Sequence, residues 1–382
     1  MKRLSSHDKI RLIRLLLYRH RKLLQKKYNL EEKKVYYSSI RKMMPSAPLP
    51  SEALPKPTFT KTNEKRPLLR IEIITPPTDL SLRRNYAEVA GFIQHFRHWL
   101  YNRPRPTKRQ IRRVDFTKIQ HVSPSAALVL ASELDRWQST NRMKLVPYDP
   151  EAWNPEVGRI FYDLGLFDLL GIECPDTIKY DDSPNITKVL KYVRQKVVDP
   201  QRLGEMLTHL TEIAGEIEAR NFIYDGLIEA LKNAKQHAYI ENRWYGVALG
   251  TSWMTGAYNP RQKRLTAAVY DCGVGIPETL PYSSQWEKIK DSLGLFEGNE
   301  SSRRIAAALK VGRSRTGEAQ RGNGLPTMMR LIDQIGGELR ILSGYGEVIY
   351  YGNDKIRSKA LPGAIGGTLI EWRLQGEGCD DD

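Results

Sequence analysis

Two patterns of apolar positions alternate between residues 67 and 175. Short runs typical of strands lie at Leu69–Ile74, Arg113–Ile119 and Lys144–Val146. Helical spacing of apolar residues lies at Asn85–Tyr101, Pro124–Trp137 and Val157–Leu170. Strands that alternate with helices are typical of an α/β domain, which we expect for residues 67–175.

A second alternation fills residues 201–376. Two helical patterns come first: one runs from Leu203 to Ile217, and the other begins near Ala219 and includes Leu227, Leu231 and Ala234. Strand patterns at Val247–Met254 and Leu265–Tyr270 flank an Asn259-Pro260 turn, and a helical pattern follows at Met328–Ile335. A final strand follows Gly366-Gly367, so we expect a second α/β domain.

The remaining segments lack these alternations. Residues 5–30 predict an amphipathic helix among basic residues, and Pro45–Pro57 cannot continue a helix. The predicted organisation is a basic helical arm (1–45), a Pro-rich linker (46–66), an α/β domain (67–175), a polar linker (176–200), a second α/β domain (201–376) and an acidic tail (377–382).

Positive charge is concentrated in two places. Residues 1–45 hold 14 lysines and arginines against three acids, and a second basic cluster lies at 103–113. Such clusters suggest contact with nucleic acid or with an acidic protein surface, and the alternative is a solvated helix face together with a solvated loop. Charge alone reads no base sequence.

Cysteine usage and hydropathy set the expected compartment. Cys174, Cys272 and Cys379 are far apart and form no metal-binding or disulfide pattern. No apolar run reaches the roughly 18 residues that a membrane-spanning helix needs, and no signal peptide is evident at the N-terminus. We therefore expect a cytoplasmic protein without membrane contact.

Three motifs in the second domain carry chemistry. Glu229 and Asn233 lie four residues apart, so they share one face of a helix, where a carboxylate can orient water and an amide oxygen can ligate Mg²⁺. The run Asp271-Cys-Gly273-Val-Gly275-Ile276-Pro277 follows a strand and offers a carboxylate beside exposed backbone. Gly322-Asn323-Gly324-Leu325 opens a helix whose N–H groups suit phosphates.

The order E-x-x-x-N, D-x-G-x-G-I-P, G-x-G-L and a final G-T at Gly367-Thr368 resembles the nucleotide-binding domain of the GHKL (histidine-kinase-like) ATPases. The resemblance covers about Leu203–Leu374 and implies a Bergerat α/β sandwich that binds ATP and Mg²⁺. No Walker-type phosphate loop occurs in the sequence.

The resemblance also implies individual roles. Asn233 would hold Mg²⁺, Asp271 would bind the adenine amino group, and Thr368 would support that contact. The remaining implied nucleotide-binding residues are Gly273, Gly275, Ile276, Gly322, Asn323, Gly324 and Leu325. Glu229 would act as general base, since members that hydrolyse ATP or phosphorylate serine carry an acid there. Residues 278–321 would form a lid over the nucleotide.

The first α/β domain resembles a STAS domain, the fold of anti-sigma-factor antagonists. The resemblance rests on Asp115–Ala127 and on the segment that begins at Val157. It makes Ser125 a candidate phosphoacceptor, but Ser123-Pro124 replaces the usual Asp-Ser before it. The alternative is that Ser123 simply caps a helix that begins at Pro124.

Three functions remain open from the sequence. The first is an ATPase that works as a nucleotide-driven conformational switch, with a protein or nucleic-acid partner and a homodimer as possible assemblies. The second is a serine/threonine protein kinase of the anti-sigma-factor type that acts on a STAS domain. The third is a regulatory or defence module that binds ATP without hydrolysis. Stress signalling, mobile-element biology and antiviral (phage) defence all fit as pathways.

Overall fold

The structure is a computed structural model that describes residues 70–101, 110–141, 145–179, 185–214, 220–239, 250–313 and 324–375. All of these residues belong to one compact unit, which comprises 55–241 and 247–382. The predicted arm (1–45), Pro-rich linker (46–66) and acidic tail (377–382) lie outside the described residues, as does most of the basic cluster at 103–113.

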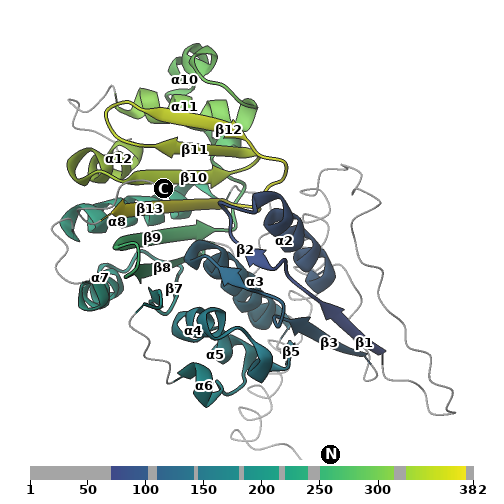
Figure 1. The fold of residues 1–382 in the computed structure, drawn as a ribbon. Helices are drawn as coiled ribbons and strands as arrows, with labels where there is room; N and C mark the ends of the chain where they lie inside the picture. Colours follow the sequence, from purple (N-terminus) through teal and green to yellow (C-terminus); the bar gives the residue numbers. More distant parts are fainter. Residues whose placement is uncertain are drawn as a thin grey trace, which may run out of the picture. The chain divides into compact units, whose positions relative to one another are not determined.

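Residues 70–179, here called the first region, form a mixed α/β layer (Figure 1). Three parallel strands make a small sheet in the order β1-β3-β5, and a two-stranded parallel pair joins β2 to β4. The elements are β1 (Arg70–Ile74), β2 (Asp79–Leu80), α2 (Tyr86–Tyr101), β3 (Gln110–Asp115), β4 (His121–Val122), α3 (Pro124–Asn141), β5 (Val146–Tyr148), η1 (Pro150–Ala152), α4 (Pro155–Leu164), α5 (Leu166–Leu170) and α6 (Asp176–Lys179).

The single helix predicted over Val157–Leu170 is two helices, which corrects that expectation. Gly165 lies between α4 and α5 with φ of +91°, a left-handed conformation that glycine adopts without a steric penalty. Its N–H closes α4 on the carbonyl of Tyr162 at 2.9 Å. The apolar spacing continues through the break because α4 and α5 both pack on α3.

Residues 185–375, here called the second region, build a large antiparallel sheet. Its strand order is β12-β11-β10-β13-β9-β8-β6, and β7 also pairs with β8. The strands are β6 (Lys188–Val189), β7 (Val193–Gln195), β8 (Ser252–Asn259), β9 (Arg264–Asp271), β10 (Glu338–Ser343), β11 (Gly346–Tyr350), β12 (Ile356–Ala360) and β13 (Thr368–Gln375). The segment predicted as a linker, 176–200, therefore contributes α6, β6 and β7.

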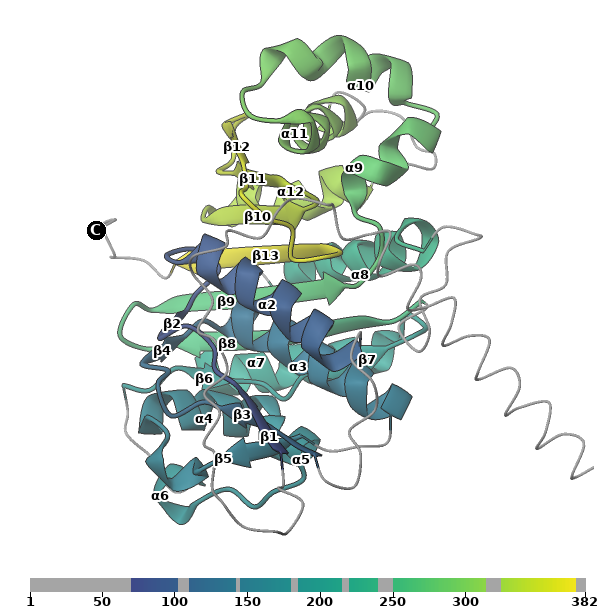
Figure 2. The same cartoon turned by 90° about the vertical axis from the view of Figure 1, so that its right-hand side faces the viewer.

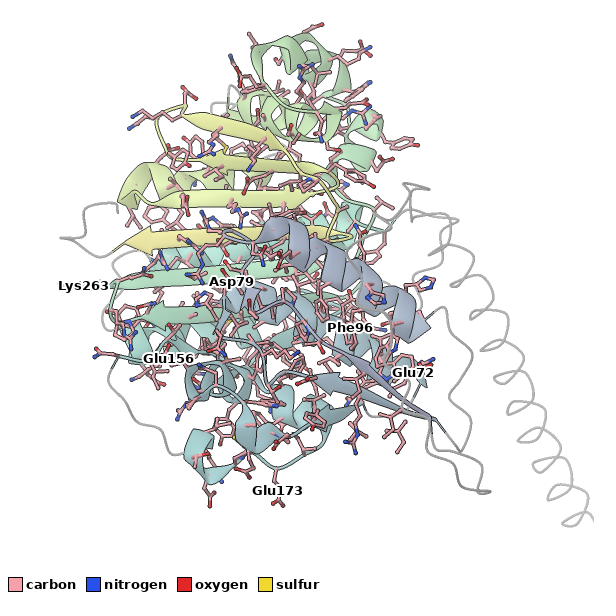
Figure 3. The ribbon with its side chains drawn as sticks, turned by 45° about the vertical axis from the view of Figure 1, so that its right-hand side comes forward. Glu72, Asp79, Phe96, Glu156, Glu173 and Lys263 are labelled. Atoms are coloured by element: carbon pink, nitrogen blue, oxygen red, sulfur yellow. The ribbon has the colours of Figure 1, made fainter. Side chains whose placement is uncertain are left out.

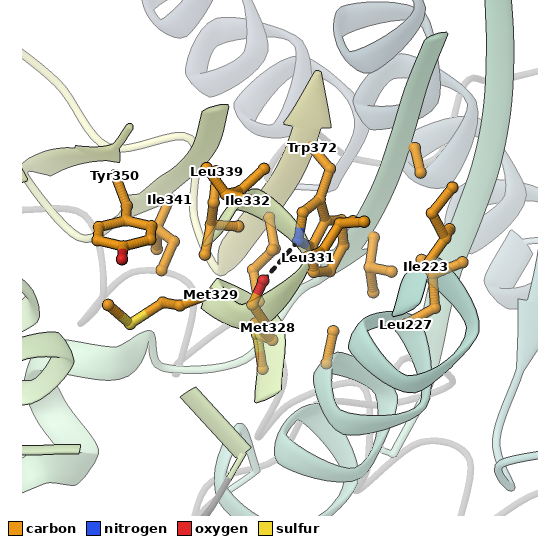
Figure 4. Close-up of a cluster of buried hydrophobic side chains, with 14 of the residues drawn as sticks. Ile223, Leu227, Met328, Met329, Leu331, Ile332, Leu339, Ile341, Tyr350 and Trp372 are labelled. Atoms are coloured by element: carbon orange, nitrogen blue, oxygen red, sulfur yellow. Dashed lines mark hydrogen bonds between the residues drawn. The ribbon is translucent and has the colours of Figure 1, made fainter. Parts of the chain in front are cut away.

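Helices cover one face of the large sheet (Figure 1). The helices of the second region are α7 (Pro200–Ala214), α8 (Arg220–His237), α9 (Ile276–Thr279), η3 (Leu280–Tyr282), α10 (Trp286–Ser292), η4 (Leu293–Leu295), α11 (Glu300–Arg313) and α12 (Gly324–Ile335). Their apolar sides and alternate residues of the strands form one core, which includes Leu227, Met328, Ile341 and Trp372 (Figure 4). Trp372 also donates its indole N–H to the Met328 carbonyl at 3.1 Å.

The first region covers the opposite face of the large sheet through α2 and α3 (Figure 2). Phe96 on α2, labelled in Figure 3, has no exposed surface. Trp253 on β8 donates to Asp135 on α3 at 2.8 Å, which joins the sheet to that helix. Strands β8, β9 and β13 are thus covered on both faces by helices from different parts of the chain, whereas residues of the edge strand β12 are exposed or half-buried.

In the described parts of the chain, none of the helices is both long and apolar enough to cross a membrane.

Candidate functional site

A row of buried polar side chains crosses the helix-covered face of the large sheet. Ser343 pairs in register with Thr368, Thr368 with Asp271, and Asp271 with Ser252. Residues that pair directly across strands point to the same face of a sheet. Each of the four side chains is less than 7 % exposed, so this polar row interrupts a face that is otherwise apolar.

Backbone and hydroxyl groups bond to three members of this row. The N–H of Gly273 donates to Asp271 Oδ1 at 2.7 Å, and the N–H of Thr368 also bonds to the Asp271 carboxyl. Ser343 Oγ lies 2.9 Å from Thr368 Oγ1 and accepts from the N–H of Ile276 at 2.8 Å. These bonds tie the end of β9, the start of β13, the end of β10 and the loop before α9 to one another.

Burial dominates the electrostatics of Asp271. Removal from water raises the pKa of its carboxyl to about 7, and the two backbone hydrogen bonds oppose that rise only partly. No cation offsets the burial in the interactions that set this pKa. A hydrogen-bond donor on a ligand would complete the coordination of this carboxyl.

A cavity of about 1090 Å³ opens beside the polar row. Its walls are α8, the loop and short helices from Gly275 to Gln285, the inner side of α11 and the start of α12. This volume is slightly above the range of roughly 300–1,000 Å³ that is usual for small-molecule sites. Eight of the residues implied by the resemblance line it: Glu229, Asn233, Asp271, Gly275, Ile276, Gly324, Leu325 and Thr368.

Helix α8 brings Glu229 and Asn233 to the cavity together, as their spacing predicts. Lys232, which the sequence reasoning did not single out, also lines it and holds Glu229 in an ion pair at 2.6 Å. Both side chains remain partly exposed, at 47 % for the lysine and 24 % for the glutamate. Such an exposed pair contributes little to stability, and an anion in the cavity would compete for the lysine.

Two glycines bring backbone close to the cavity. A Cβ on Gly275, where φ is +93°, would stand 2.9 Å from Ser343 Oγ. A Cβ on Gly324 would stand 2.9 Å from the amide nitrogen of Asn233. The first turn of α12 and the side chain of Asn233 therefore approach as closely as glycine allows.

Gly273, which the resemblance implies as a nucleotide-binding residue, packs against the end of α8. Among the described residues it is not part of the cavity wall, and its Cα faces the end of α8. A Cβ there would stand 2.3 Å from the carbonyl oxygen of Ala238, to which Val274 donates at 2.8 Å. Its absent side chain allows packing between two backbones. Gly322 and Asn323 lie outside the described residues.

Within the expected lid, Arg304 is held by protein groups. It pairs with Glu300, donates to the carbonyl of Pro277 at 3.0 Å and stacks over Trp286 with its guanidinium carbon 5.2 Å from the ring centroid. Its contacts join α11 to α9 and α10, so it supports the cavity wall. Among the described residues, the buried side-chain oxygens of Ser283 and Gln285 on that wall have no hydrogen-bond partner.

Ser125 lies on the other side of the large sheet. Its side chain is 1 % exposed and donates to Glu371 on β13. Glu371 alternates with Ile370, which lines the cavity, so the two side chains point to opposite faces. The alternative role of Ser123 is confirmed: its hydroxyl accepts from the N–H of Ala126 at 3.3 Å and caps α3.

The last two members of the basic cluster at 103–113, Arg112 and Arg113, lie in strand β3. Arg112 is 7 % exposed, lies over the rings of Trp99 and Trp137, and pairs with Glu72 at 3.7 Å. Its guanidinium is thus engaged inside the first region and faces away from solvent. The members from Arg103 to Arg109 lie outside the described residues.

In the described residues no three His, Cys, Asp or Glu side chains are grouped as a metal site. The expected Mg²⁺ would take one protein ligand, Asn233, with phosphate oxygens and water as the others.

No protein-family model matches the chain, and a search of curated proteins gives no match.

Proposed function

We propose that this chain is an ATP-binding ATPase of the GHKL type, whose second region is a Bergerat-type sandwich and whose first region is STAS-like. The supporting observation is the convergence of the four motifs. Glu229, Asp271, Gly324 and Thr368 are separated by up to 139 positions in the sequence and yet line one cavity.

The residues present fit an adenine nucleotide. Asp271 is a buried carboxyl with acceptor capacity left after its two backbone bonds, which suits an exocyclic amino group. Gly324 begins α12, whose N-terminal N–H groups and positive dipole end suit phosphates. Both features lie on the same cavity, so a ligand with a base at one end and phosphates at the other fits both.

Glu229 would act as the general base. Its carboxylate lies on the cavity wall one helical turn from Asn233, within the region where phosphates would lie. Bound Mg²⁺ would neutralise phosphate charge and leave the γ-phosphorus open to water. Phosphate oxygens would also draw Lys232 from Glu229, which frees the carboxylate to accept the proton of the attacking water.

Hydrolysis, rather than transfer to Ser125 in the same chain, is favoured by the position of that serine. The hydroxyl is buried on the face of the sheet that the cavity does not occupy and is bonded to Glu371. Transfer would require α3 to leave the sheet. ATP binding and hydrolysis would instead act as a switch whose output reaches a partner, with residues 1–45 as the proposed contact to nucleic acid or an acidic protein.

One experiment tests the proposal. The full chain is incubated with Mg²⁺ and ATP labelled at the γ-phosphate, and free phosphate and protein-bound label are both counted. Free phosphate without labelled protein supports the ATPase, and label on protein supports a kinase. ATP that binds in calorimetry without either product indicates a regulatory ATP-binding module. Absence of ATP binding rejects the proposal.

A further inference from the structure

A single helix of the first region holds the loop that leads into β13. Residues 361–367 form this loop, which ends at Thr368 on the cavity wall. Side chains of α2 donate to three of its carbonyls: Tyr86 to Gly363 at 2.8 Å, Gln94 to Ala364 at 2.9 Å and Arg97 to Gly366 at 3.4 Å. Three bonds from one helix fix the path of this short segment.

The three donors lie on one side of α2. Positions 86, 94 and 97 are eight and three residues apart, which places them within an arc of about 80° at 3.6 residues per turn. Helix α2 lies beside β13 in Figure 2. The side of α2 that carries the donors is therefore the side that meets the loop, and a shift of α2 moves all three bonds together.

Tyr270 reinforces this loop from the sheet. Its hydroxyl donates to Gly366 O at 2.5 Å, and Arg97 donates to that hydroxyl at 2.7 Å. Arg97 also pairs with the buried Glu133 of α3 at 2.6 Å. Tyr270 immediately precedes Asp271 in β9, so the same network reaches the strand that carries the buried carboxyl.

The loop fits this network with little spare room. Gly366 has φ of +73°, and a Cβ there would stand 2.1 Å from a guanidinium nitrogen of Arg97. Gly367 has φ of +106°, and a Cβ there would stand 1.9 Å from the carbonyl oxygen of Asp271. The next residue, Thr368, donates its N–H to the Asp271 carboxyl. The path from α2 to Asp271 is therefore a chain of direct contacts.

We propose that α2 sets the affinity of the adenine end of the cavity, with Tyr86, Gln94 and Arg97 as positioning residues. The inference rests on the proposed function, because it assumes that Asp271 and Thr368 hold a nucleobase. It makes the first region a regulator of that site: any partner that displaces α2 weakens adenine binding. By thermodynamic reciprocity, bound ATP holds α2 against the sheet.

The test compares two ligands of the full chain. Magnesium ATP contacts both ends of the cavity, whereas magnesium tripolyphosphate lacks the base and reports the phosphate end alone. The variants are Tyr86→Phe and Gln94→Leu, each of which removes one bond to the loop. Tyr148→Phe on β5 is the matched control, because this tyrosine is 42 % exposed and lies on the small sheet.

We expect the Kd for ATP to rise about 2- to 10-fold in each variant, the range that corresponds to the loss of one net hydrogen bond. The inhibition constant of tripolyphosphate against labelled ATP stays unchanged, and so do both constants in Tyr148→Phe. In the wild type, ATP slows amide hydrogen exchange along α2 and tripolyphosphate does not.

Other outcomes distinguish a failure of the proposed function from a failure of the inference about α2. A wild type that binds no ATP rejects the proposed function and this inference with it. Folded variants with unchanged ATP affinity overturn the inference alone. Equal weakening of ATP and tripolyphosphate also overturns it, since α2 would then only support the general fold of the region.

Discussion

The two faces of the large sheet are built from alternate residues of the same strands but have opposite chemistry. On β13, Ile370 and Trp372 face the helices of the second region, where an apolar core adjoins the polar row and the cavity. Glu371 and Arg373 face the first region, where Glu371 is paired with Arg83 at 2.9 Å and with Arg373 at 3.0 Å.

The difference concerns where polar groups have their partners. On the face toward the first region, here called the charged face, carboxylates pair with arginines of the protein, and the ion pair between β13 and the first region holds the two regions of the chain together. Single nitrogens of Arg97, Arg340 and Arg373 there have no hydrogen-bond partner among the described residues. Beside the cavity, Asp271 and the oxygens of Ser283 and Gln285 keep bonding capacity that the described protein atoms do not use. Unused capacity in a cavity is typical of ligand binding, and satisfied ion pairs are typical of a fixed interface. Substitutions of the ion-paired residues on β13 and of the cavity residues should therefore have separable effects, whereas α2 reaches the cavity through the loop at 361–367.

The largest effect should come from Glu229→Gln on the cavity side. Loss of a general base lowers the turnover of ATP by about 10²- to 10⁴-fold, while ATP affinity and melting temperature remain those of the wild type. Phosphate release and calorimetry measure the two quantities. Glu212→Gln, an exposed glutamate on α7, is the control and should hydrolyse ATP normally. Normal turnover in Glu229→Gln would show that Glu229 is only a carboxylate on the helix surface and not the general base.

Glu371→Leu, on the charged face, should lower the free energy of unfolding and leave ATP turnover unchanged. Burial alone would raise the pKa of this carboxyl, but Arg373, Arg83 and Arg340 outweigh it and lower the pKa to about 2. Its removal leaves buried cations uncompensated, which costs about 3–5 kcal/mol in the free energy of unfolding. Denaturant titration measures the loss. Glu156→Gln, whose ion pair with Arg261 is exposed, should cost less than about 1 kcal/mol.

The depressed pKa of Glu371 also predicts an acid transition. A carboxyl with a lower pKa in the folded state stabilises it above the unfolded value of 4.5, and this contribution is lost as the pH falls toward about 2. The wild type should lose stability across that window, and Glu371→Leu should lose less there. Parallel pH curves for the two proteins would contradict the assigned ion pairs.

Asp271→Asn should raise the stability of the fold at alkaline pH and weaken the binding of ATP. The raised pKa of Asp271, about 7, means that ionisation of the carboxyl destabilises the fold as the pH rises from the unfolded value of 3.8 through 7. The variant should therefore be more stable than the wild type at pH 8, with the difference shrinking at pH 5. Its binding free energy for ATP should weaken by about 1–3 kcal/mol, because the single amide oxygen of asparagine is needed by the N–H groups of Gly273 and Thr368 and the amide NH2 would then face the adenine donor. Thermal melts and calorimetry give both readings, and undiminished affinity would remove Asp271 from the base-binding site.

Short sequence motifs predict the residues beside the cavity better than they predict the ion pairs of the charged face. The strand leading to Asp271, the helix with Glu229 and Asn233, and the turn before Thr368 are each visible in a short window. Ser343 was missed because its strand carries no motif, although its position beside Thr368 in the sheet makes it part of the row. Local patterns also placed β6 and β7 in a linker, because two- and three-residue strands depend on pairing with β8.

The charged face depends on contacts that no short window contains. The alternation around Glu371 is readable in β13, but its partner Ser125 lies 246 positions earlier. That distance is why the resemblance of Asp115–Ala127 to a phosphoacceptor segment gave no hint that Ser125 is buried. Likewise, Gly165 interrupts an apolar spacing that looks continuous, since only the backbone conformation of that residue divides α4 from α5.

The smallest effect should come from Ser125→Ala. The substitution removes the hydroxyl that donates to Glu371, but the carboxylate keeps its arginine partners, so the cost should be about 1 kcal/mol in the free energy of unfolding. ATP hydrolysis should be unchanged, because the serine lies on the face away from the cavity. Ser132→Ala is the matched control on the same helix, since its buried hydroxyl donates to the Val129 carbonyl at 2.7 Å and does not touch the sheet's ion pairs. If γ-labelled phosphate accumulates on the wild type and disappears in Ser125→Ala but not in Ser132→Ala, then α3 leaves the sheet during the reaction, and the charged face is part of the active cycle.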